Sequence, residues 1–129
     1  MTFDKRIISK KQFKTYLMNT LRNRVQLIGN LGKKPEIVNL ESGKKLAKFS
    51  IATNETYRDA KGEKITNTEW HNLVAWGKTA EIAEMFLDKG KEVAIIGKLS
   101  NRSYEDKEGN KKYITEIIVS EIMMFGKQE

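Results

Sequence analysis

Short apolar or alternating runs that end at turn residues dominate this sequence and limit the folds open to it. Runs of this kind, bounded by glycine, proline or charged turns, predict β-strands. The five strand patterns are residues 24–32 (RVQLIGNLG), 45–53 (KLAKFSIAT), 68–78 (TEWHNLVAWGK), 92–105 (EVAIIGKLSNRSYE) and 111–125 (KKYITEIIVSEIMMF).

One segment, residues 79–90 (TAEIAEMFLDKG), has a different period and predicts a short helix. Its apolar residues Ile82, Met85 and Phe86 recur at helical spacing. Thr79 is the expected N-cap and Gly90 the expected C-terminal stop. The predicted order is therefore three strands, one helix and two strands.

This order is that of the OB-fold, a five-stranded Greek-key barrel whose face and loops often bind oligonucleotides. A small α+β sheet could have the same order. Gly29, Gly77 and Gly97 fall inside strand patterns, where bends and bulges allow a small sheet to close on itself. We therefore expect an all-β OB-fold barrel with one short helix between strands 3 and 4.

Composition limits the other classes of function. The 129 residues suit one domain, and no apolar run reaches the length of a membrane span. The sequence lacks cysteine, and His71 is its only histidine, so disulfides, thiolate chemistry and a multi-histidine metal site are excluded. The stretch GNLGKKPE lacks the ending of a phosphate loop, and no carboxylate pair stands out. Neither a catalytic site, a metal site nor a cofactor is predicted, and an enzyme is the least favoured class.

The net charge of +7 is unevenly distributed. Residues 1–17 account for +4 of it and residues 18–129 for only +3. The N-terminal stretch also lacks the apolar core of a secretory signal, and a second methionine follows at Met18. We expect residues 1–17 to be a poorly ordered basic extension and residues 18–129 to form the single OB-fold domain.

Both tryptophans of the chain lie in the third strand pattern. An extended backbone would place Trp70 and Trp76 on one face and His71, Leu73 and Ala75 on the other. Two indoles on one face could fill a core or could form a surface on which flat rings stack. His71 would then face away from the indoles, and no partner for catalysis is evident beside it.

Other aromatic residues are accompanied by cations. Tyr57 precedes Arg58, and Arg102 lies two residues before Tyr104. An aromatic surface with neighbouring cations can hold single strands of any sequence, because every base has a π-face. Tyrosine and tryptophan also favour half-buried strand positions whatever the function. The candidates for phosphate contacts are Arg24, Arg58, Lys78, Lys98 and Arg102.

Five segments closely resemble, in order and spacing, the bacterial-type single-stranded DNA-binding proteins, over about residues 19–125. They are VQLIGNLGKKPE, FSIATNETYRD, TEWHNLVAWGKTAEIAEMFLDKG, VAIIGKLSNRSYED and YITEIIV. The resemblance implies an OB barrel, a homotetramer, and bases stacked on Tyr57, Trp70, Trp76 and Tyr104. The family more often has tryptophan at the two tyrosine positions and phenylalanine at one tryptophan position, and stacking chemistry survives each change. It also implies that His71 belongs to a subunit interface.

The resemblance further implies a cytoplasmic, nucleoid-associated protein that protects single-stranded DNA in replication, recombination and repair. Members of the family usually continue into a flexible linker and an acidic tip that recruits replication and repair enzymes, whereas this sequence stops at MMFGKQE. Binding of such partners is therefore not carried over, whether the chain is a short form or a truncated one. Two alternatives stay open, which are an RNA-binding OB domain and an OB-fold assembly module without a nucleic-acid role.

Overall fold

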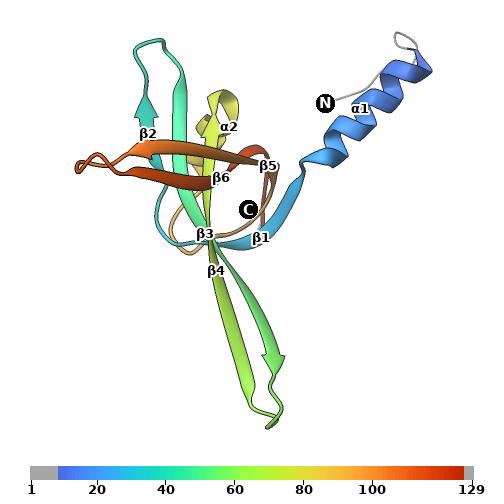
Figure 1. Ribbon diagram of the computed structural model, residues 1–129, viewed down its shortest axis with the longest axis vertical. Helices are drawn as coiled ribbons and strands as arrows, with labels where there is room; N and C mark the ends of the chain where they lie inside the picture. Colours follow the sequence, from blue (N-terminus) through green and yellow to red (C-terminus); the bar gives the residue numbers. More distant parts are fainter. Residues whose placement is uncertain (1–8, 127–129) are drawn as a thin grey trace.

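The strands of the computed structural model, which describes residues 9–126, form one sheet that closes into a barrel (Figure 1). The sheet order is β1-β5-β6-β4-β3-β2, and β1 also pairs with β3, which closes the barrel. The predicted barrel of five main strands with one helix before the last two is confirmed. A short additional strand, β2, lies between the first two predicted strands. The elements are α1 (Lys10–Arg22), β1 (Val25–Leu31), β2 (Glu36–Asn39), β3 (Lys45–Arg58), β4 (Lys64–Trp76), α2 (Gly77–Phe86), β5 (Glu92–Glu105) and β6 (Lys111–Met124).

The core lies inside the barrel and is made by alternate residues of the strands. Its largest fully buried side chains are Ile51, Leu73, Val93 and Ile95. Since successive strand residues point to opposite faces, the residues between them face outward. The outward residues of β3 and β4 are therefore the ones available to a ligand.

Helix α2 covers one end of this core, but its ends differ from the sequence prediction. It begins at Gly77, which has φ +58°, so Thr79 lies inside the helix and is not its N-cap. It ends at Phe86, and Gly90 lies in the turn that follows. The buried residues are Ala80 and Ala83, because small side chains allow the helix to approach the sheet closely.

The apolar residues Ile82, Met85 and Phe86, which suggested the helical period, are therefore not the packed face of α2. They remain 36%, 67% and 49% exposed. The prediction that this segment is helical is confirmed.

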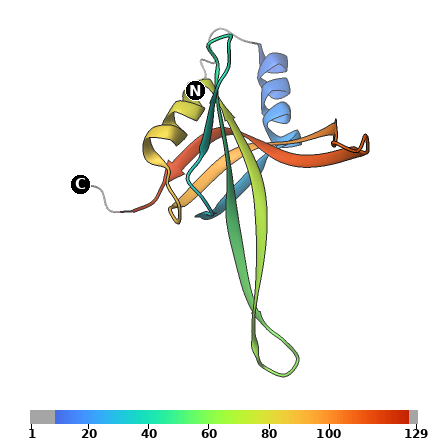
Figure 2. The same ribbon diagram turned by 90° about the vertical axis from the view of Figure 1, so that its left-hand side faces the viewer.

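Strands β3 and β4 extend much further than their apolar patterns indicated. Continuous antiparallel pairing runs from Leu46 opposite Trp76 to Arg58 opposite Lys64. The outer part projects from the barrel as a two-stranded arm (Figure 2). Apart from Tyr57 and Ile65 its side chains are polar on both faces, because both faces meet solvent, and so the period of two disappears from the sequence. Cross-strand hydrogen bonds such as Thr68 Oγ1 to Asn54 Oδ1 (2.7 Å) replace apolar pairing there.

Two of the three glycines that suggested closure lie where strands approach closely. A Cβ on Gly29 would lie 2.3 Å from the carbonyl oxygen of Ala52, where β1 meets β3. A Cβ on Gly97 would lie 2.3 Å from the carbonyl oxygen of Ile118, beside an irregularity in the β5–β6 pairing. Gly77 instead allows the turn from β4 into α2.

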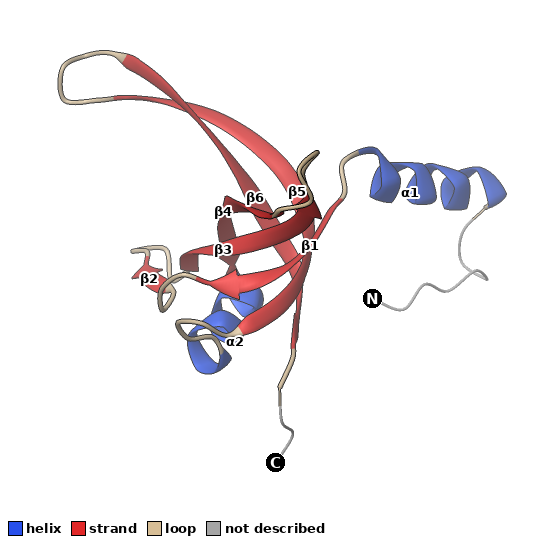
Figure 3. Ribbon diagram, turned by 90° about the horizontal axis from the view of Figure 1, so that it is seen from below, coloured by secondary structure: helices blue, strands red, loops and turns tan. Residues whose placement is uncertain are grey.

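Helix α1 stands away from the barrel (Figure 3) and crosses the expected boundary at residue 17. Residues 10–17 are helical where the sequence suggested a poorly ordered extension, and residues 1–8 lie outside the described residues. Ser9 and Gln12 form a capping box, with Ser9 Oγ accepting from Gln12 N at 3.1 Å. No residue of α1 is buried, so the division into an extension and a barrel domain stays a prediction. Neither of the two described helices is long and apolar enough to cross a membrane.

Candidate nucleic-acid interface

The alternation predicted for β4 is confirmed. Leu73 and Ala75 point into the core and are 1% and 0% exposed, whereas Trp70 and Trp76 on the other face are 59% and 44% exposed. Neither indole is a core residue of this chain. Both are therefore large apolar rings held at the surface by a rigid strand.

Residues from four strands share the face that carries the indoles. Ser50 of β3 lies opposite Asn72, and Ala52 lies opposite Trp70. On the other side β6 runs parallel to β4, with Val74 opposite Ile118. Strand β5 pairs with β6 and adds Arg102 and Tyr104 to the same face. Arg102 lies opposite Ile114, and Tyr104 lies opposite Lys112. We name this surface, with Trp70, Trp76, Arg102 and Tyr104 on it, the stacking face.

A groove of about 320 Å³ lies on the stacking face. Asn72 and Val74, the residues between the two indoles on β4, are part of its lining. A volume near 300 Å³ is at the lower end of ligand pockets. The groove is bordered by four cations, which are Lys33, Lys34, Lys48 and Arg102, and by two carboxylates, which are Glu36 and Glu116.

Of these four cations only Arg102 was predicted from the sequence. Its Nε donates to Glu116 Oε1 at 2.8 Å, and the arginine side chain remains 48% exposed. Lys33 and Lys34 follow Gly32, one residue after the end of β1, and this closeness to a strand end is the signal that could have identified them. Lys48 lies on this face because the pairing of β3 with β4 puts it opposite Val74, so counting along β3 alone could not have identified it.

Gly32 holds Trp70 in place, a role that the sequence did not reveal. A Cβ on Gly32 would lie 2.7 Å from Cζ3 and 3.0 Å from Cη2 of the indole, so the ring packs against the bare backbone. Gly32 N donates to the carbonyl oxygen of Ser50 at 3.1 Å, which fixes this backbone to β3. One side of the indole is thus supported by the chain, and 59% of the residue stays exposed.

The remaining predicted cations do not line this groove. Arg24 and Lys98 border a second concavity beside Asn23 and Ser120. Arg58 closes the tip of the β3–β4 arm, where its Nη1 donates to the carbonyl oxygen of Gly62 at 2.8 Å. Lys78 is exposed at the start of α2, two residues after Trp76.

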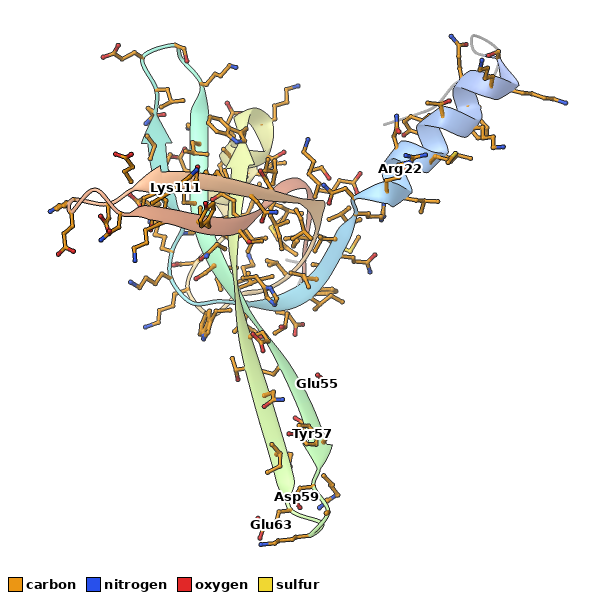
Figure 4. All side chains as sticks on the ribbon, viewed as in Figure 1. Arg22, Glu55, Tyr57, Asp59, Glu63 and Lys111 are labelled. Atoms are coloured by element: carbon orange, nitrogen blue, oxygen red, sulfur yellow. The ribbon has the colours of Figure 1, made fainter. Side chains whose placement is uncertain are left out.

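Tyr57 is not brought together with the other aromatic residues within this chain. It lies far out on the β3–β4 arm (Figure 4). It pairs with Ile65 and stands five residues beyond Ala52, the partner of Trp70, so the register puts it on the reverse face of the arm. Its side chain is 47% exposed.

His71 faces away from the indoles, as predicted. It is half-buried, and its Nε2 lies 2.9 Å from Thr53 Oγ1 on the neighbouring strand. Within residues 9–126 no cluster of three or more histidine, aspartate or glutamate residues could hold a metal ion.

Comparison with known proteins assigns the family. The model of the Single-strand binding protein family matches residues 22–125. The chain belongs to this family. The match covers the whole barrel and leaves out most of α1.

Single-strand binding proteins from several bacteria are similar to this chain. The Single-stranded DNA-binding protein 1 of Chlorobaculum tepidum is 44% identical over 108 residues, which are 83% of this chain and 67% of that protein. The Single-stranded DNA-binding protein 1 of Xylella fastidiosa is also 44% identical over 108 residues and is covered to 79%. The Single-stranded DNA-binding protein of Neisseria meningitidis serogroup A is 39% identical over 104 residues, which are 81% of this chain and 60% of that protein.

A solved structure extends this similarity to the fold. The Plasmodium falciparum SSB complex with ssDNA superposes with a TM-score of 0.75 at 34% identity. The superposition covers 81% of this chain and 95% of that one. The fold is therefore the OB-fold of single-strand binding proteins.

Proposed function

We propose that this protein binds single-stranded DNA without strong sequence preference, through base stacking on the stacking face. The observation that carries the proposal is the pair of half-exposed indoles, Trp70 and Trp76, on a face that also holds a groove lined with cations. The family assignment and the names of the relatives support the same ligand.

The geometry of the indoles fits a strand that crosses the sheet. Trp70 and Trp76 are six residues apart on one strand, about 20 Å at 3.3 Å per residue. They would therefore stack different nucleotides. Tyr104 offers a third ring on the same face, at the end of β5. Each stacked base contributes about 1–3 kcal/mol, and any base can take each position.

The cations of the groove would neutralise the phosphates between the stacked bases. Lys33, Lys34 and Lys48 approach from β3 and the segment after β1, and Arg102 approaches from β5. Since neutralised phosphates release counterions, affinity should fall as salt rises. Other predicted residues would extend the path beyond the groove. They are Tyr57 with Arg58 on the β3–β4 arm, Lys78 on α2, and Arg24 with Lys98 in the second concavity.

We also propose that the protein is a homotetramer. The outer face of β1, β5 and β6 carries an apolar concavity of about 480 Å³, lined by residues that include Ile28, Ile96, Met123 and Phe125. Ile28 and Met123 are 52% and 64% exposed. Exposed apolar patches of this kind mark interaction sites, and a second copy offers the same apolar surface in return. His71 is proposed to contribute to a subunit contact from its own face of β4.

This activity would protect exposed strands during replication, recombination and repair, in the cytoplasm at the nucleoid. Binding of replication and repair proteins is not part of the proposal.

The proposal is tested by fluorescence anisotropy with a labelled oligo(dT) and unlabelled competitors. We expect tight binding, equal competition by mixed-sequence DNA and weaker competition by matched RNA. RNA that competed better than DNA would favour the RNA-binding alternative, and no binding of either would favour an assembly module. Light scattering tests the assembly, and a monomer at micromolar concentration would contradict the tetramer.

A further inference from the structure

The β5–β6 hairpin extends beyond the barrel as an arm with two open faces (Figure 2). Strand β5 pairs with β1 only as far as Gly97, and β6 pairs with β4 at Ile117 and Ile118. Among the described residues, the two strands between positions 98 and 116 therefore pair only with each other, while the Asn23 side chain hydrogen-bonds the backbone of Leu99 at the base of the arm. A strand of DNA could follow one face of this arm and pass round its edge to the other.

Each face of the arm carries one tyrosine. The register places Tyr104 opposite Lys112 and Ser103 opposite Tyr113, so the two tyrosines lie on neighbouring pairs that face opposite ways. Tyr104 shares the stacking face with Arg102. Tyr113 lies on the reverse face and is 76% exposed, more than Tyr104 at 47% and either indole.

A lysine lies beside the Tyr113 ring, as cations lie near the other aromatic residues in the sequence. Lys111, two residues earlier on the same face, places its Nζ 5.6 Å from the centroid of the Tyr113 ring. Figure 4 shows Lys111 on this arm, away from the β3–β4 arm that carries Tyr57. An exposed ring with an ammonium group beside it matches the two parts of a nucleotide, a flat base and an anionic phosphate.

We propose that Tyr113 is an additional base-stacking position, reached by single-stranded DNA that continues from Tyr104 round the edge of the β5–β6 arm. Lys111 binds the phosphate of the nucleotide that stacks there. This inference rests on the proposed function. The inference differs from the proposed function in the ligand, which is a DNA strand too long to be bound by the stacking face alone.

The test compares oligo(dT) of increasing length on Tyr113→Ala, Tyr113→Phe and the parent. Lengths begin near the roughly 4 nucleotides of the smallest OB-fold sites and extend well beyond 16. We expect Tyr113→Ala to bind short oligomers as the parent does and long oligomers about five-fold or more weakly, the effect of losing one stacked base. Tyr113→Phe should keep the affinity of the parent, because a π-face remains.

Two control variants separate this effect from general ones. Phe86→Ala removes another exposed aromatic ring, on α2, and should leave binding at every length unchanged. Tyr104→Ala should weaken binding of shorter oligomers as well. In a Trp70→Phe, Trp76→Phe background, Tyr113→Trp supplies an indole whose fluorescence should be quenched by long oligomers and not by short ones.

The failures are distinguishable. A parent that binds no oligo(dT) would overturn the proposed function and this inference with it. A parent that binds while Tyr113→Ala matches it at every length, or an indole at position 113 that no oligomer quenches, would overturn the inference alone. A change of oligomeric state in Tyr113→Ala would overturn it too, because Tyr113 would then be a subunit contact.

Discussion

Substitution of Gly32 by alanine should weaken DNA binding through Trp70 while the barrel stays folded. The added Cβ would lie 2.7 Å from Cζ3 of the indole, whereas ordinary contacts begin at 3.4 Å, so the ring must move by about 0.7 Å. The atoms it meets are the far end of a side chain, which can shift. Gly32 is not among the glycines with positive φ, so alanine can adopt its backbone conformation.

The expected loss is bounded by the stacking energy of one base. If displacement of the ring abolishes the stack, affinity falls by about 1–3 kcal/mol, or roughly 5- to 150-fold, and a partial displacement costs less. Anisotropy with oligo(dT) measures the affinity, and thermal unfolding should show little change. Tryptophan emission should also shift, because the surroundings of Trp70 change.

A double-mutant cycle supplies the control. In a Trp70→Ala background, Gly32→Ala should cause no further loss of affinity, since the ring that it displaces is gone. Unchanged affinity in Gly32→Ala, or an equal loss with and without the indole, would refute the assignment of Gly32 as the support of Trp70.

Four further substitutions test the interface and the barrel. Trp70→Ala and Trp76→Ala should each weaken binding by about 1–3 kcal/mol, nearly equally for DNA of different sequence, with melting temperatures little changed; early unfolding would mean that the indoles are structural. Arg102→Ala should reduce the slope of log affinity against log salt by about 0.7 if the arginine neutralises one phosphate, and an unchanged slope with unchanged affinity would remove it from the interface. Gly97→Ala should destabilise the fold by about 1–3 kcal/mol or more, because its Cβ would lie 2.3 Å from a backbone carbonyl oxygen of β6. Thermal unfolding measures this loss. A melting temperature equal to that of the parent would contradict the close approach.

The side of a strand on which each residue lies could be predicted from the sequence. Which sides of two neighbouring strands form one face could not, because that depends on the register between them. The faces of Trp70, Trp76 and His71 follow from counting along β4, because the period of two is local. The reverse-face position of Tyr57 depends on the pairing of β3 with β4, which is fixed by the length of the turn between them. The outer parts of these strands were missed because an arm exposed on both faces has no apolar period.

Contacts that depend on the space around a residue, rather than on its type, also could not be predicted from the sequence. Gly32 looks like a turn glycine, and only the position of Trp70 shows that the indole needs the room. The buried face of α2 was not identified, because Ala80 and Ala83 give a weaker hydrophobic signal than Met85 and Phe86. The close approach of the helix to the sheet favours the small side chains there.

The central claim is that Trp70 and Trp76 are surfaces on which bases of single-stranded DNA stack. Titration with poly(dT), followed by intrinsic tryptophan fluorescence at two salt concentrations, tests it most directly, since these two indoles are the only ones in the chain. Stacking on these indoles predicts strong quenching that saturates, with a weaker affinity at the higher salt concentration. Emission that stays constant while an anisotropy assay reports bound DNA would contradict it.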